Sequence, residues 1–138
     1  MYAEIGWGPP YAAAKFRCYD KSDPARKLAF MRIQRQVPRY GTEWASLPTR
    51  AAQAICAHES PSELEAFKIF KQKNCSDVPQ LLEYHEGQQP DNALVPGGFT
   101  STVVWETVPG CPLSSELFWG YDRTKRDLIR AEFYSVLR

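Results

Sequence analysis

Residues 60–113 constrain the fold most, because the apolar pattern in this stretch changes from a helical period to a strand period. Ser60 can cap a helix whose first position suits Pro61, and Glu63 follows three residues after the cap, where it completes a capping box. Asn74 is a suitable stop signal. The helix between these signals has an apolar face made of Leu64, Phe67, Ile69 and Phe70. The stretch therefore opens with an amphipathic helix.

A β-hairpin is predicted before this helix. Residues 15–19 and 28–37 carry strand-forming side chains and flank the turn-rich residues 20–24. The glycines and prolines of residues 1–14 are typical of an irregular arm. The hairpin therefore supplies the first two strands of a sheet.

Two further strands are predicted after the helix. Residues 78–82 form the first, residues 95–98 (Val-Pro-Gly-Gly) form a turn, and residues 102–105 form the second. The polar residues 86–92 are expected to be an exposed loop. The pattern as a whole predicts the α+β class, with a small antiparallel sheet and packed helices.

The remaining segments are an insertion and two C-terminal helices. Residues 38–59 contain a short predicted helix over residues 49–56. Tyr40 and Trp44 in this insertion could wall a pocket or pack the loop onto the domain. A short helix over residues 113–119 precedes a longer one from Asp122. The longer helix has an apolar stripe formed by Leu128, Ile129, Phe133, Val136 and Leu137.

Length and charge limit the classes of function. A chain of 138 residues with 43% hydrophobic content is long enough for one core, so we expect a single domain. The net charge of +1 favours neither nucleic acid nor an anionic membrane as a partner. The sequence shows no membrane-spanning run and no secretion signal, so we expect a cytoplasmic protein.

The four cysteines predict no metal site. Cys18, Cys56, Cys75 and Cys111 are scattered without a CxxC pair, a spacing that indicates neither structural zinc nor a redox dithiol. We expect free thiols, and no metal ligands are assigned.

A family resemblance rests on two of these motifs. Residues 63–70 (Glu-Leu-Glu-Ala-Phe-Lys-Ile-Phe) followed by Val-Pro-Gln-Leu-Leu at residues 78–82 resemble the helix and strand of the N-terminal lobe in the aminoglycoside phosphotransferase and choline kinase branch of the protein-kinase-like fold. A group of kinase-like proteins common in filamentous fungi is the most similar. The resemblance covers residues 28–137, and residues 105–113 are similar to the hinge between the two lobes.

The resemblance implies roles for five residues. Arg32 occupies the place of a strand lysine that contacts nucleotide phosphates and pairs with a helix glutamate. Glu63 is the implied partner, although its capping-box role competes, and Glu65 is the fallback. Backbone groups from Glu106 to Val108 would meet an adenine in a kinase hinge. The implied ligand-binding set is therefore Arg32, Glu63, Glu106 and Val108.

The resemblance ends before the family's catalytic loop and metal-binding aspartate, so we do not expect phosphotransferase activity from this chain. No cofactor is required, and ATP binding is left open. The domain is expected to comprise an arm (1–14), the sheet, helices and hinge (15–113) and C-terminal helices (114–138).

Three interpretations of function follow. The first is a non-catalytic, pseudokinase lobe that binds a partner protein or a small ligand. The second is a small-metabolite enzyme of lyase, isomerase or cyclase type that reuses the nucleotide cleft. Its candidate acid–base groups are Arg32, Glu63, Glu65, His85 and Glu106. The third is a fragment of a longer kinase-like protein. In each case the apolar stripe of the last helix is expected to be covered by a second copy, as a homodimer, or by a partner protein.

Overall fold

The computed structural model describes residues 9–55 and 62–137. It packs as two compact units, one ending at Thr107 and the other starting at Val108. The boundary lies inside the hinge predicted over residues 105–113. The single-domain expectation stays a prediction, and each unit is described here by itself.

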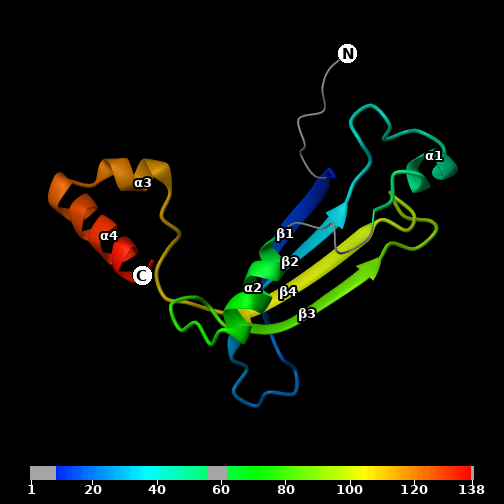
Figure 1. The fold of residues 1–138 in the computed structure, drawn as a ribbon. Helices are drawn as coiled ribbons and strands as arrows, with labels where there is room; N and C mark the ends of the chain where they lie inside the picture. Colours follow the sequence, from blue (N-terminus) through cyan, green and yellow to red (C-terminus); the bar gives the residue numbers. More distant parts are fainter. Residues whose placement is uncertain (1–8, 56–61, 138) are drawn as a thin grey trace. The chain divides into compact units, whose positions relative to one another are not determined.

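The first unit contains a four-stranded antiparallel sheet in the order β1-β2-β4-β3 (Figure 1). The strands are β1 (Tyr11–Tyr19), β2 (Leu28–Gln36), β3 (Leu81–Gln88) and β4 (Phe99–Glu106). The helix α2 (Glu63–Gln72) comes between β2 and β3 in the sequence. The expected α+β class with a small antiparallel sheet is confirmed.

The hydrophobic core lies between α2 and one face of the sheet, which we call the helix face. Leu64 is only 1% exposed and packs with buried side chains of β3 and β4. Burying a leucine this completely contributes about 1.5 to 3 kcal/mol. The core cluster comprises Leu64, Leu81, Val103 and Trp105, with Phe30 and Phe67 packed against it.

The C-terminus of α2 ends as the sequence predicts. Asn74 adopts a φ of 50°, a left-handed conformation that asparagine tolerates better than most residues. Its N–H donates to the oxygen of Lys71, and the N–H of Cys75 donates to the oxygen of Phe70. These two bonds form a Schellman motif that satisfies carbonyls at the helix end.

The N-terminus of α2 differs from the prediction. The helix starts at Glu63, and Ser62 precedes it without a side-chain capping bond. The predicted cap, Ser60, and Pro61 lie outside the described residues. The carboxylate of Glu63 is bound to Arg32 and Gln34 of β2.

Several strand boundaries differ from the predicted ones, and β4 begins at Phe99 instead of residue 102. β1 begins at Tyr11, so the irregular arm is shorter than predicted. β3 begins at Leu81, later than predicted, and Gln80 before it is bound to Glu106 at the end of β4. β3 also extends to Gln88, so the first part of the loop predicted over residues 86–92 is a strand paired with β4.

Buried glutamines connect the insertion to the sheet. Gln36, 1% exposed, donates from Nε2 to the oxygen of Gln53 at 2.6 Å and accepts from the N–H of Ile55 at 3.1 Å. Gln89 donates from Nε2 to the Gln36 oxygen at 2.8 Å. A Cβ at Gly98 would lie 2.8 Å from Gln36 Oε1, so this position requires glycine. The network fixes the loops at one end of the sheet.

The insertion contains α1 (Leu47–Ala51), capped by Ser46, whose hydroxyl accepts from the N–H of Thr49. The side chain of Arg50 holds this helix against the loop before β4, because its Nη1 donates to the oxygen of Leu94 at 2.8 Å. The predicted helix over residues 49–56 is therefore shorter and starts earlier than expected.

The second unit is a pair of helices, α3 (Ser115–Gly120) and α4 (Arg123–Val136). Ser114 and Asp122 cap them, with side chains that accept from the N–H of Leu117 and Lys125. Both helices were predicted from the sequence. Among the described residues, no helix combines the length and the apolar content needed to cross a bilayer.

Candidate functional site

An ion pair between the sheet and α2 is the centre of the candidate site. Nη1 of Arg32, on β2, donates to Oε1 of Glu63, the first residue of α2. Gln34 lies two residues along the same strand, and its Nε2 donates to the other oxygen of Glu63 at 3.4 Å. The carboxylate is thus held by two side chains of one strand face, and both side chains of the ion pair are about a third exposed or less (33% and 24%).

Aromatic rings flank the arginine. The guanidinium of Arg32 lies 5.5 Å from the ring centroid of Trp105, and Lys15, its cross-strand neighbour on β1, places Nζ 4.0 Å from the centroid of Phe30. Lys15 Nζ is also 5.6 Å from the Trp105 ring. Cations over aromatic faces are attracted by the ring quadrupole, so the rings hold both cations on the helix face.

The charge of this cluster is unbalanced. Lys15 and Arg32 contribute two positive charges, and Glu63 contributes one negative charge. A partly exposed site of this composition attracts an anion, and an arginine fork matches the oxygens of phosphate or carboxylate. Sequence reasoning missed Lys15 and Gln34; pairing the predicted strands residue by residue would have placed Lys15 opposite Arg32.

Glu65, the fallback partner for Arg32, points elsewhere. It is 62% exposed and pairs with Lys68 Nζ at 2.8 Å. Lys68 also contacts Glu86 at 3.3 Å. The hydrogen bond to Glu65 is the main cause that raises the pKa of Lys68 above its ordinary value, with Glu86 adding to it and burial opposing it. Glu63, not Glu65, therefore faces Arg32.

The other candidate groups do not converge on the ion pair. His85 pairs with Thr102 in the β3–β4 ladder and so lies on the face opposite Val103 and the core. Glu106 is engaged with Gln80: its Oε1 accepts from the Gln80 N–H, and its own N–H donates to the Gln80 oxygen, both at 3.0 Å. These bonds anchor the start of β3.

Val108, the last member of the implied ligand-binding set, is the first residue of the second unit and is half exposed. In the first unit, Tyr40 and Trp44 are almost fully exposed, at 99% and 97%. Neither aromatic side chain packs the insertion onto the sheet or walls a pocket, contrary to both readings of the sequence.

Two depressions in the first unit lie near the sheet. One, of about 180 Å³, borders Glu63 and is otherwise apolar, with Phe67, Phe70 and Pro79 in its wall. The other, of about 630 Å³, lies beside the β1–β2 turn and includes Lys27. The smaller depression gives the candidate site an apolar neighbour next to the carboxylate.

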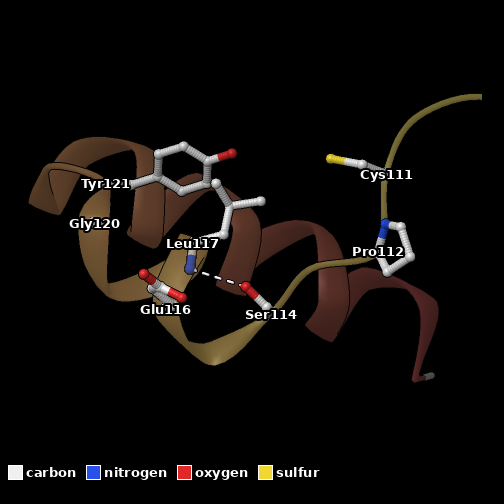
Figure 2. Close-up of a pocket in the computed structure, with 7 residues that line it drawn as sticks. All are labelled: Cys111, Pro112, Ser114, Glu116, Leu117, Gly120 and Tyr121. Atoms are coloured by element: carbon white, nitrogen blue, oxygen red, sulfur yellow. Dashed lines mark hydrogen bonds between the residues drawn. The ribbon is translucent and has the colours of Figure 1, made fainter.

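The second unit has a depression of about 530 Å³ of its own (Figure 2). Cys111 and Pro112 lie on the extended segment on one side, while Leu117 and Tyr121 come from the helix side. The only hydrogen bond among the residues drawn in Figure 2 is the helix cap from Leu117 N–H to Ser114. No residue of the implied kinase-like set lines this depression.

The described cysteines Cys18, Cys75 and Cys111 are free thiols, and Cys56 lies outside the described residues. Within residues 9–55 and 62–137, no three His, Cys, Asp or Glu side chains gather in a way that could hold a metal ion.

Comparisons of the chain with protein-family models, with curated proteins and with solved structures found no match. The functional interpretation therefore depends on the contacts described above and on the sequence motifs that led to them.

Proposed function

We propose that this chain is a non-catalytic, kinase-like lobe that binds a small phosphate-bearing ligand beside Arg32. The contact between Arg32 and Glu63 is the observation that carries the proposal. The motif resemblance implied that a base on the second hairpin strand pairs with the glutamate at the start of the following helix. These two side chains, 31 residues apart in sequence, are in contact.

The chemistry of the site supports an anionic ligand. Glu63, itself held by Gln34, orients the guanidinium of Arg32, and the Trp105 ring lies against it, so Arg32 loses little further freedom when it binds a phosphate. Lys15 adds a second positive charge on the neighbouring strand. The aromatic rings of the helix face offer an apolar surface to the rest of the ligand.

Binding is favoured over acid–base catalysis because the titratable candidates are dispersed. Glu65 is bound to Lys68, Glu106 is bound to Gln80, and His85 lies on the opposite face from Arg32. A general acid and a general base must both reach one substrate. Glu65, Glu106 and His85 therefore do not supply an acid and a base together beside the Arg32–Glu63 pair.

Thermal unfolding with and without Mg-ATP tests the proposal. At a hundred times its dissociation constant, a ligand adds about 2.7 kcal/mol to the free energy of unfolding, a shift of several degrees in a domain of this size. Tripolyphosphate without the nucleoside reports on the phosphate contacts alone.

Matched arginine variants separate the site from general charge effects. Arg32→Gln should abolish the ligand-induced shift, whereas Arg35→Gln, an exposed arginine on the opposite face of the same strand, should keep it. A shift that persists in Arg32→Gln, or the absence of any shift in the wild-type chain with both ligands, would refute phosphate binding at this site.

The second part of the proposal concerns α4. The side chains of Leu128, Phe133 and Leu137 remain 63–64% exposed, and an apolar stripe of this kind favours a covering partner, either a second copy or another protein. Sedimentation of the wild type and of Phe133→Asp tests this surface, with Thr124→Asp as the control on the same helix. Identical sedimentation of the wild type and Phe133→Asp, both monomeric, would remove the homodimer.

A further inference from the structure

The two outer strands of the sheet differ in how well their edges are protected. β3 carries a bulge between Leu81 and Glu83, which interrupts its pairing. In β1, at the other end of the sheet, all nine residues pair one-to-one with β2 (Figure 1). Proteins protect edges with bulges, prolines and short strands, because an unprotected edge pairs with other chains. β3 has such a device, and β1 is long and regular.

The direction of the free backbone groups follows from one hydrogen bond. The N–H of Val37 donates to the oxygen of Pro10 at 3.0 Å, so residues 10 and 37 form a hydrogen-bonded pair. Such pairs alternate along an antiparallel ladder. The even residues of β1 therefore bond to β2, and the odd residues direct their N–H and C=O groups away from it. We call these groups the outer edge of β1; they belong to Tyr11, Ala13, Lys15, Arg17 and Tyr19.

Side chains leave this edge accessible. No described strand lies beyond β1 in the sheet order. Residues 12–14 are three alanines, which offer no bulk against a close approach. A lysine in mid-strand often guards an edge, but the ammonium group of Lys15 lies 4.0 Å from the Phe30 ring on β2, on the side away from the outer edge.

We propose that the outer edge of β1 pairs with the same edge of a second copy of this chain. The two strands run antiparallel and are related by a twofold axis at Ala14. The two four-stranded sheets then form one continuous sheet of two copies. A twofold contact is self-complementary, so one edge serves both chains.

The charges on β1 select this register. An axis at Lys15 would place two lysines directly opposite each other, and an axis at Phe16 would place Lys15 opposite Arg17, both of which are unfavourable. An axis at Ala14 pairs residues 11–17 of the two copies. It puts Lys15 opposite Ala13 and Arg17 opposite Tyr11, and it is the longest register in which no two cations are directly opposite each other.

A cysteine cross-link tests the axis. In a non-hydrogen-bonded antiparallel pair the Cα atoms are about 4.5 Å apart, within the range that a disulfide spans. Under mild oxidation Ala14→Cys should give a covalent dimer of the 15.8 kDa chain on a non-reducing gel. Ala12→Cys is the matched control: it is exposed on the same face but lies opposite Phe16 of the second copy, so it should cross-link no more than the wild type.

Charge substitutions at Ala13 test the pairing without a covalent cross-link. The twofold axis creates two contacts between position 13 of one copy and Lys15 of the other. Ala13→Glu therefore adds two attractive pairs and should tighten the dimer by about 2- to 30-fold, and Ala13→Lys should weaken it by a similar factor. Ala13→Pro removes an outward N–H, which an edge strand tolerates, and should give a folded monomer.

Sedimentation equilibrium of these variants decides the proposal. A wild-type dimer that responds oppositely to Ala13→Glu and Ala13→Lys supports it. A wild-type chain that is monomeric at about 100 μM overturns the proposal. A dimer that is insensitive to all three Ala13 variants, or that only Phe133→Asp dissociates, also overturns it. Two separate twofold contacts, at β1 and at α4, would link copies into open chains, so a discrete dimer identifies only one of them. Phosphate binding is measured separately and can fail or hold independently.

Discussion

Removing the charge of Glu63 should destabilise the first unit and uncouple α2 from the sheet. Glu63→Gln keeps the length and planarity of the side chain but removes the ion pair with Arg32. Gln34 can still donate to the introduced amide oxygen. The substitution therefore isolates the charge.

The expected magnitude lies between two limits. Exposed ion pairs contribute about 0.2 to 1 kcal/mol, and removing one partner of a fully buried pair costs about 3 to 5 kcal/mol. With side chains 33% and 24% exposed, Arg32 and Glu63 are partly hydrated, and water can solvate the arginine left behind. We expect a loss of about 1 to 2 kcal/mol in the free energy of unfolding, or roughly 3 to 8 °C in Tm.

Urea denaturation of a double-mutant cycle measures the pair itself. Arg32→Gln also removes the contact with Trp105, but this loss cancels in the cycle with Glu63→Gln. The coupling energy should be about 1 kcal/mol and should decrease in high salt. Glu65→Gln is the matched control on the same helix: its pair with Lys68 is more exposed, so it should cost less than about 0.5 kcal/mol. A coupling energy of zero, or equal costs for the two glutamates, would refute the assignment of Glu63 as the partner of Arg32.

Three further predictions concern the packing, the helix end and the first hairpin turn. Leu64→Ala should cost about 2 to 5 kcal/mol in urea denaturation, and the half-exposed Ile69→Ala on the same helix should cost less than about 1 kcal/mol; equal costs would contradict the placement of the core. Asn74→Val should cost about 1 to 2 kcal/mol because a β-branched residue is strained at a φ of 50°, while Asn74→Gly should be neutral or stabilising by the same assay. The Ser22 hydroxyl, and then its N–H, hold the pKa of Asp20 below the ordinary value, so Ser22→Ala should raise this pKa in a carboxyl NMR titration. The contribution of these hydrogen bonds to stability is present above the pKa of Asp20 in the unfolded state and is lost as the pH falls through its pKa in the folded state. An unchanged titration of Asp20 in Ser22→Ala would contradict the role of the hydroxyl.

The sequence predicted the elements well where local signals act alone. The strands, the Asn74 stop and the C-terminal helices were visible because turn residues, helix stop signals and apolar periods are local. The boundaries of β1 and β3 were missed because strand pairing, a tertiary effect, extends β1 back to Tyr11 and β3 forward to Gln88. Lys15 was missed for the same reason, since its proximity to Arg32 depends on register.

The choice between Glu63 and Glu65 was open in the sequence and follows from packing in the structure. Leu64 and Phe67 both pack against the sheet, and a helix advances about 100° per residue, so Glu63 lies about 40° from Phe67 around the helix, whereas Glu65 lies about 160° from it and turns toward Lys68 and solvent. A carboxylate in the first turn is also favoured by the helix dipole. The packing of Leu64 together with Phe67 therefore positions the carboxylate that orients Arg32. Substitutions that loosen the core at Leu64 should accordingly weaken phosphate binding as well as stability, although Leu64 itself would touch no ligand.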